Sequence, residues 1–495
     1  MLLSPEFGLA FIVFLTIYWL TGQRYAGPLA APVYMDFEPV KPIVPRLGIL
    51  QQPRVILLLL GFAIYVASTA PKFTLIWAVF TLLQALAFSS ANHAPTLAKK
   101  WLAALFIALA AGLLVLGKYY EPLREFGLEH HLQLAELMPP FSLGNEISFS
   151  FFCFQTITWC VAWARPQARE APWVSSLLIN GFLPTLTAGP ILRAEKFLPQ
   201  LARPLRIRFI EIAFGRICLG LIKKLIIANW LAQQWVDPVF KDPTTFAAPE
   251  LLGAALAYSL QIYFDFSGLS DLVYGISALL GIHIPRNFNQ PYLATNLRQF
   301  WQRWHISLSS WIRDYIYKPL GGNRYGALWS QIALALAMLL SGLWHGAGWN
   351  FVAWAGLHVA GTLLHRAWRG VTDIRLPKFL GWLLTFGWVT LAWVFFRSPT
   401  LADALLFLNR CFDPQAWQAV ASARIPVLQA EMWGLAGVST LAFVVLYFGP
   451  QLARLQWRLI RKTGWTASLI CWTLLILATL FLGPSGVPNF IYASF

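Results

Sequence analysis

Two histidines lie in unusual surroundings for so apolar a chain. His305 follows an arginine and a tryptophan in a basic segment, and His345 lies between two apolar runs, in the stretch Ser341-Gly-Leu-Trp-His-Gly-Ala-Gly-Trp349. An ionisable side chain at membrane depth is costly, so it is a functional candidate by default. A neutral imidazole can take the proton of an alcohol while that alcohol attacks a thioester carbonyl. The structural alternative is a buried, hydrogen-bonded histidine packed between tryptophans.

Two carboxylates interrupt an apolar run that could otherwise cross a bilayer. Asp265 and Asp271 both fall within the stretch Gln261-Ile-Tyr-Phe-Asp-Phe-Ser-Gly-Leu-Ser-Asp271. Because an unpaired buried carboxylate is expensive, each must be paired, neutral or exposed to a water-filled funnel. A structural ion pair with an arginine such as Arg298 or Arg303 is preferred over direct chemistry.

Two further polar pairs leave their roles open. Lys223 and Lys224 adjoin apolar residues, so they either extend to the membrane interface or meet the phosphates of a nucleotide-like donor. His358 and His365 are seven residues apart, which places them on one helix face. We interpret these two histidines as a polar stripe near a membrane exit.

The segment from Pro285 to Gly326 is the longest hydrophilic interruption in the second half of the chain. Its only acid is Asp314, and its cations are Arg286, Arg298, Arg303, Arg313, Lys318 and Arg324. This excess predicts the cytosolic side of a membrane. The segment is also rich in tryptophan and tyrosine, so we expect an amphipathic or re-entrant helix against the membrane. Its cations would attract the phosphates of an anionic donor.

The composition predicts the elements that hold these residues. Of 495 residues, 58% are hydrophobic and only 12% are charged, about half of what soluble domains carry. The formal net charge of +16 indicates positive cytosolic loops, not nucleic-acid binding, because no soluble basic domain is visible. We predict an all-α polytopic protein of the lipid bilayer, with spans near 6–22, 54–69, 73–91, 101–117, 146–164, 174–192, 208–230, 250–283, 327–344, 347–366, 378–396, 432–449 and 467–483.

One predicted span is broken, and the chain divides around it. Two prolines and a glycine interrupt 183–190, and non-helical backbone at membrane depth survives only in protein or beside a watery cavity. We therefore expect a pocket wall there.

We divide the single membrane domain into N-terminal transmembrane helices at 1–140, a catalytic core at 141–400 and C-terminal transmembrane helices at 401–495. No nucleotide loop, serine nucleophile elbow or metal-binding motif is recognised.

Several motifs together resemble a known family. They are Phe288-Asn-Gln-Pro-Tyr292, Phe300-Trp-Gln-Arg-Trp-His305, Ser309-Ser-Trp-Ile-Arg-Asp314, Tyr317-Lys-Pro-Leu-Gly-Gly-Asn-Arg324 and Gly342-Leu-Trp-His-Gly-Ala-Gly-Trp349. This set resembles the core of the membrane-bound O-acyltransferases. The Pro-Leu-Gly-Gly-Asn-Arg stretch resembles the alginate O-acetyltransferase branch, and the D-alanyl transfer protein of teichoic acid synthesis is a more distant relative. Further similar stretches include Ile147–Phe151 and Asn489–Tyr492.

The resemblance implies a ring of about a dozen transmembrane and re-entrant helices around a central funnel. His345 matches the family's essential histidine and His305 the second polar position of its paired site. The expected donor-binding residues are Arg298, Arg303, Arg313, Lys318, Arg324, Lys223 and Lys224. The expected funnel lining is Trp304, Trp344, Asp265, Asp271, Asn350 and His358.

The resemblance also implies a reaction and its partners. The donor would be acetyl-CoA or an acyl carrier thioester, with no metal and no permanently bound cofactor. The acyl group would reach an extracytoplasmic polysaccharide, directly or through a periplasmic SGNH-type partner, at a bacterial inner membrane. Ser148-Phe-Ser150 and Cys153 depart from the family pattern, which puts the polymer and the partner in doubt.

Three other functions remain as alternatives. A transporter or flippase for a lipid-linked sugar would show inverted repeats, and none is visible. A scaffold of a polysaccharide secretion complex would tolerate the loss of His305 and His345. A glycosyltransferase would need acidic residues in an extracytoplasmic loop; Glu121, Glu125 and Glu129 are available, but without a recognisable metal-binding arrangement.

Overall fold

The computed structural model describes residues 5–20, 53–69, 71–140, 149–165, 173–186, 189–201, 210–374, 376–418 and 465–482, with single positions at 434, 437 and 440. Within these ranges the chain forms helices and turns and no strand, which agrees with the all-α prediction. The chain divides into two compact units. The first contains Met1–Cys218 and Leu269–Pro285, and the second contains Leu219–Gly268 and Arg286–Ile491.

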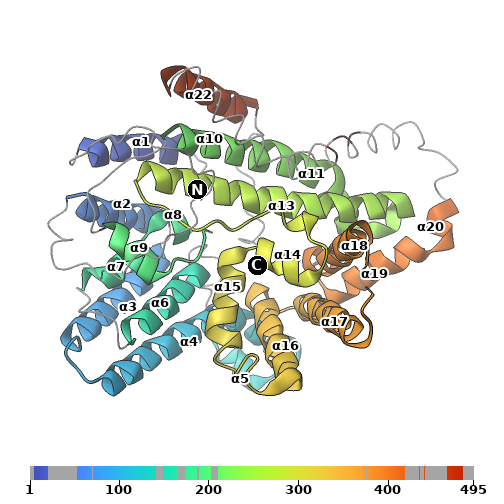
Figure 1. Ribbon diagram of the computed structural model, residues 1–495, viewed down its shortest axis with the longest axis horizontal. Helices are drawn as coiled ribbons and strands as arrows, with labels where there is room; N and C mark the ends of the chain where they lie inside the picture. Colours follow the sequence, from blue (N-terminus) through green and yellow to red (C-terminus); the bar gives the residue numbers. More distant parts are fainter. Residues whose placement is uncertain are drawn as a thin grey trace. The chain divides into compact units, whose positions relative to one another are not determined.

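The first unit is built from helices of very different lengths. They are α1 (Pro5–Leu20), α2 (Pro53–Thr69), α3 (Pro71–Ser90), α4 (Thr96–Glu129), α5 (Gln133–Glu136), α6 (Phe149–Trp163), α7 (Val174–Asn180), α8 (Leu183–Leu186), α9 (Ala194–Leu201) and most of α10 (Ile210–Leu221). Helix α4 packs against α6, and α3 packs against α7 (Figure 1). The predicted interruption of the apolar run at 174–192 is confirmed, because α7 ends at Asn180 and α8 is a single turn.

The second unit contains helices of three kinds. Its π-helices are η2 (Ile222–Ala228), η3 (Ala232–Val236) and η6 (Arg313–Tyr317), and its 3₁₀ turns are η4 (Pro243–Thr245) and η5 (Pro291–Leu293). Its α-helices are α11 (Asn229–Leu231), α12 (Asp237–Lys241), α13 (Ala248–Leu279, ending in the first unit), α14 (Leu297–Arg303), α15 (Ile306–Ile312), α16 (Gly326–His345), α17 (Trp349–Val371), α18 (Lys378–Arg397), α19 (Leu401–Phe412), α20 (Pro414–Gln418) and α22 (Trp465–Leu482).

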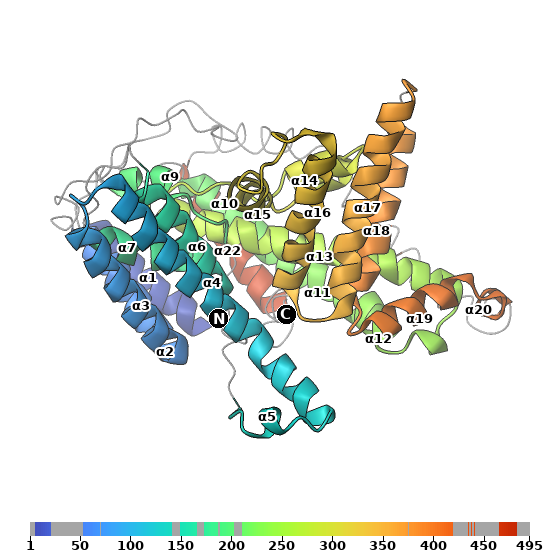
Figure 2. The ribbon, with the colours of Figure 1, turned by 90° about the horizontal axis from the view of Figure 1, so that it is seen from below.

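Helices α16, α17 and α18 lie side by side in the second unit (Figure 2). Alanine and leucine, strong helix formers, fill α16, and the short link from Gly346 to Gly348 returns the chain as α17. A Cβ at Gly342 would lie 2.6 Å from the carbonyl oxygen of Phe351, so only glycine permits this close approach. The first turn of α17 therefore packs directly on the end of α16 that carries His345.

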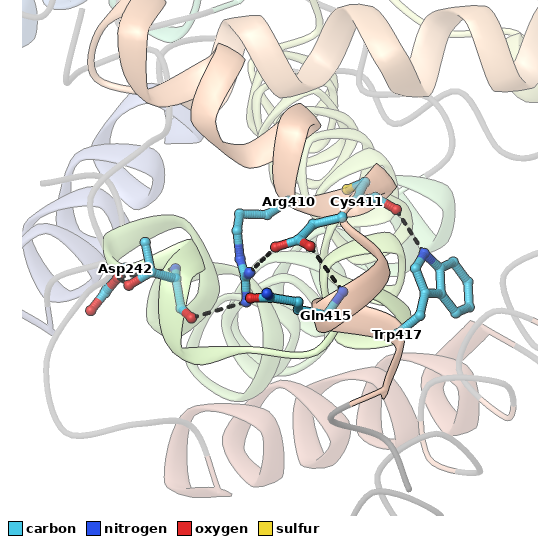
Figure 3. A network of polar contacts seen from close by, with 7 residues as sticks. Asp242, Arg410, Cys411, Gln415 and Trp417 are labelled. Carbon is cyan, nitrogen blue, oxygen red and sulfur yellow. Dashed lines mark hydrogen bonds and ion pairs between the residues drawn. The ribbon is translucent and has the colours of Figure 1, made fainter.

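The start of α19 and its far end are both fixed by hydrogen bonds. Thr400 and Asp403 form a capping box at the N-terminus. At the other end Arg410 pairs with Asp413 and donates to the carbonyl oxygen of Thr244 at 3.2 Å (Figure 3). These contacts tie α19 to the turn η4 within the second unit.

Four helices in the described ranges are long and apolar enough to cross a membrane, at Lys72–Ser90, Thr96–Glu129, Gly326–His345 and Lys378–Arg397. Shorter apolar helices lie at Val55–Ile64, Phe149–Trp163 and Ile470–Thr479. The predicted span at 432–449 and the motif residues 147–148 and 489–492 fall outside the described residues. The three-part division of the chain stays a prediction.

Candidate functional site

His345 is the last residue of α16 and lies within a group of aromatic rings. Its exposed fraction is 4%. The ring centroids of Phe396 on α18 and Trp354 on α17 lie 4.9 and 5.1 Å from the imidazole centroid, both with steep interplanar angles. A Cβ at Gly346 would lie 2.3 Å from the ring of Phe351, so the glycine after His345 makes room for this packing. Three helices together fix the position of this imidazole.

His305 occupies the junction between α14 and α15, outside the four candidate spans. Its φ of +41° places it in the left-handed region, which is costly for a non-glycine residue. The backbone that follows His305 is held by Asn287, whose carbonyl oxygen accepts from the Ile306 amide at 2.9 Å. The imidazole is 1% exposed and lies edge-on to Phe266, with centroids 4.6 Å apart. Burial lowers the pKa of His305 to about 3, so this side chain is neutral at physiological pH.

A continuous aromatic group joins the two histidine-bearing segments within the second unit. Trp304, next to His305, lies 5.1 Å from Trp393, which in turn stacks at 6.1 Å on Trp354, the neighbour of His345. Sequence reasoning named Trp304 but missed Trp354 and Trp393. The one available signal was the spacing of Trp354 and His358, four residues apart on one face of a helix.

His358 and Asn350, two predicted lining residues, have different surroundings. His358 is fully buried against aromatic rings, whereas His365 on the same helix is exposed, so the two do not form one polar stripe. Asn350 is 1% exposed and its Nδ2 donates to the carbonyl oxygen of Ser398 at 2.9 Å. This bond ties the start of α17 to the end of α18. Trp344 lies 4.5 Å from His345.

Asp265 is ion-paired with Lys224, and both side chains are buried, at 4% and 3% exposed. The expected structural ion pair is therefore present at Asp265, with Lys224 as the partner in place of Arg298 or Arg303. Sequence distance concealed the partner, since Lys224 approaches from the π-helical segment η2.

Two other predicted polar residues have contacts within their own units. The neighbouring Lys223 lies over the ring of Tyr263 at 5.9 Å, in the second unit. Asp271, in the first unit, pairs with Arg216 at 2.7 Å, which confirms the expected ion pair with an arginine, although Arg216 was not one of the two arginines named.

The predicted donor-binding cations of the basic segment lie on its surface. Arg298, Arg313, Lys318 and Arg324 are exposed, and Arg303 is half-buried. Asp314 pairs with Arg313 at 3.0 Å and with Lys318 at 2.8 Å.

A pocket of about 450 Å³ opens at the start of α16 and is lined by Asn323, Gly326, Ala327, Ser330, Gln331 and Arg366. Arg366 on α17 approaches the Ser330 hydroxyl at 3.4 Å and was not predicted.

The chemical repertoire of the described residues is narrow. No cluster of three His, Cys, Asp or Glu side chains that could hold a metal ion occurs among them. What they offer is buried imidazoles enclosed by indole and phenyl rings, with cations at the surface. Such a site can move a proton at an imidazole and can bind an anionic donor, and it suits acyl transfer to an alcohol.

Comparison with known proteins places the chain in a family. The membrane-bound O-acyltransferase family profile matches residues 62–399. A peptidoglycan O-acetyltransferase of Helicobacter pylori is 41% identical over 47% of this chain, a match that covers 45% of that protein. The probable alginate O-acetylase of Pseudomonas aeruginosa is 33% identical over 88% of this chain and 78% of its own length.

The comparison also identifies a more distant relative. The teichoic acid D-alanyltransferase of Streptococcus thermophilus is 27% identical over 52% of this chain and 69% of that protein. The family profile covers more than half of the chain and includes both His305 and His345. The chain therefore belongs to the membrane-bound O-acyltransferase family and is a multi-pass membrane O-acyltransferase.

Proposed function

We propose that this enzyme O-acetylates an extracytoplasmic polysaccharide, alginate-like, cellulose-like or peptidoglycan, at a bacterial inner membrane. The similarity to an alginate O-acetylase over 88% of the chain and to a peptidoglycan O-acetyltransferase over 47% supports this substrate class. The observation that carries the proposal is the position of His345, at the end of a candidate span and enclosed by rings from α17 and α18. The predicted helical ring with a central funnel would bring both substrates to this imidazole.

His345 acts as the general base of the transfer. It takes the proton of the attacking hydroxyl while that oxygen bonds to the carbonyl carbon of the thioester. The C–S bond then breaks, the sulfur takes the proton back from His345, and an ester and a free thiol result. The same step serves if the first acceptor is a serine of a periplasmic SGNH-type partner. His305, neutral and buried, orients the thioester or stabilises the oxyanion.

The donor, acetyl-CoA or an acyl carrier thioester, approaches from the cytosolic side. The basic segment supports this direction, because its exposed cations outnumber its single acid. The pocket at the start of α16 adds Arg366 to the cations available for the donor's phosphates. Lys224 contributes less, because its ammonium is already paired with Asp265.

The test replaces His345 in cells that make the polymer. His345→Ala removes the base, and the O-acetyl content should fall by about 10²-fold or more at unchanged protein level. His365→Ala is the matched control, because His365 is exposed on the neighbouring helix, and full acetylation is expected. Normal acetylation by His345→Ala would disprove the catalytic assignment.

A further inference from the structure

Three aromatic side chains beside His345 form a triangle of rings that carry nitrogen. Trp301 on α14 and His358 on α17 have centroids 4.9 Å apart. Trp354 lies 5.1 Å from His358 and 5.9 Å from Trp301. The fourth ring in the line is His345, 5.1 Å from Trp354. Trp354 is thus the member of the triangle that contacts the proposed base.

The ring nitrogens of this triangle have no hydrogen-bond partner among the described residues. These atoms are Nε1 of Trp301, Nε1 of Trp354, and both Nδ1 and Nε2 of His358. Trp354 is 1% exposed and His358 is fully buried. A buried polar group without a partner destabilises the folded state, so each such group in a native protein calls for an explanation.

The chemistry of the atoms narrows what they would bind. An indole N–H only donates, and a neutral imidazole supplies one donor and one acceptor. The triangle therefore offers three donors and one acceptor. Such an excess of donors suits an oxygen with lone pairs and no proton, above all an oxygen that gains negative charge. Acyl transfer creates one beside the general base.

We propose that Trp301, Trp354 and His358 form the site that binds the acyl oxygen of the donor as it becomes an oxyanion. The inference rests on the proposed acetyl transfer and adds a site to it. When the hydroxyl oxygen bonds to the carbonyl carbon, the π electrons of the C=O bond move to the oxygen, where these donors stabilise them. Collapse restores the C=O bond as the C–S bond breaks, and the thiolate takes the proton from His345.

The surroundings of the triangle support this assignment over His305. His358 contacts Trp354, and Trp354 contacts His345, whereas His305 packs edge-on to Phe266 on α13. His305 is then left with orienting the thioester. The three rings contact one another, and catalytic hydrogen bonds commonly tighten only when substrate is bound. Trp301 is the only partly exposed member of the three, so it is the outer edge of the site.

The test measures activity and stability together, in proteoliposomes that contain the full chain, radiolabelled acetyl-CoA and the polysaccharide. His358→Phe keeps the ring and removes both nitrogens, so kcat should fall by about 10²-fold. The KM for acetyl-CoA should stay within about twofold, and the melting temperature should hold or rise because two unpartnered atoms are gone. His358→Gln should have a lower melting temperature than His358→Phe but a higher kcat.

Two more variants keep the inference falsifiable. Trp354→Phe removes one indole N–H and keeps a ring, and it should lower kcat in the same way. His365→Phe is the control on the same helix and should change neither kcat nor melting temperature.

The proposed oxyanion site is overturned if His358→Phe and Trp354→Phe keep the wild-type kcat, or if kcat falls only in proportion to a lower melting temperature. In either case, an inactive His345→Ala variant would leave the proposed function intact. Equal transfer by wild type and His345→Ala overturns the proposed function itself.

Discussion

The second unit buries polar side chains in two contrasting ways. Between η2 and α13 it buries two opposite charges that satisfy each other, Lys224 and Asp265. Between α14 and α17 it buries neutral ring nitrogens that no described residue satisfies, on Trp301, Trp354 and His358. The first arrangement is complete as it stands. The second leaves hydrogen-bonding capacity unused, in a group of rings of which one, Trp354, contacts the proposed base.

This difference separates a structural polar contact from a functional one. A buried ion pair is a self-contained structural element, because removing one partner leaves the other charge uncompensated. Unpartnered nitrogens in a well-packed aromatic group are a cost to folding and are useful only when another molecule supplies an acceptor. Substitutions should therefore harm stability in the first region and catalysis in the second.

The largest effect is expected at the ion pair. Lys224→Ala removes the buried cation that pairs with the Asp265 carboxylate, which should lower the free energy of unfolding by about 3–5 kcal/mol. Thermal unfolding of the purified protein in nanodiscs measures it. A melting temperature equal to that of wild type would contradict a structural role for the pair.

A double variant completes this experiment. Lys224→Met with Asp265→Leu replaces both charges by apolar side chains, so most of the lost stability should return. If Lys224 instead binds donor phosphates, the double variant should be stable but should show a raised KM for acetyl-CoA. The pair thus separates the two roles that the sequence left open for this lysine.

The close approach of α16 and α17 gives the next effect. Gly342→Val places side-chain carbons against the Phe351 carbonyl and should cost about 1–3 kcal/mol. Because Gly342 lies one turn before His345, acetyl transfer should fall as well. Gly356→Val is the control, since a Cβ at Gly356 meets no atom within 4 Å. Equal activity and melting temperature in the two variants would show that the helices tolerate separation.

Acid stability reports on the buried His305. Its folded pKa of about 3 lies below the ordinary value near 6.5, so the unfolded chain binds the proton first. Its contribution is complete only well above pH 6.5 and decreases as the pH falls, by about 1.4 kcal/mol at pH 5.5. Between pH 7.5 and pH 5.5, the melting temperature of His305→Gln should therefore fall by less than that of the wild type. An identical pH dependence would mean that His305 is solvated.

The smallest effect is expected at Arg216 and Asp271 in the first unit. This pair is partly exposed, with exposed side-chain fractions of 23% and 11%, so solvent screens it. Arg216→Ala should lower the free energy of unfolding by about 1 kcal/mol or less, and high salt should reduce the difference further. A loss as large as that of Lys224→Ala would mean that exposure does not distinguish the two pairs.

Local sequence patterns predicted the helices better than they predicted which residues pair between helices. The run 250–283 was predicted as one span, and α13 crosses both aspartates without a break because each carboxylate is paired. The identities of those partners could not be predicted, because Lys224 and Arg216 are distant in sequence. The π-helical winding of η2 has no signature in apolar periodicity either.

The candidate site was predicted at its centre but not around it. His345 and His305 were recognisable because ionisable residues in apolar runs are rare. The rings that enclose His345 come from three helices, and although Trp393 and Phe396 share a face of α18 by their spacing, nothing in the sequence relates them to Trp354 on α17. His358 is buried because rings from α14 and α18 pack against it, whereas His365 is exposed, and helix periodicity alone does not predict this difference.

The π-helical turns of η2 have a consequence for insertions and deletions. A π-turn holds one residue more than an α-turn, so deleting one residue within Ile222–Ala228 would restore regular winding. Because the wide turn accommodates the extra residue, side chains on either side of the segment would then keep their present faces, whereas a deletion in regular helix would rotate all later side chains by about 100° about the helix axis. This segment should therefore tolerate the loss of one residue better than a regular helix does, provided that Lys224 still meets Asp265.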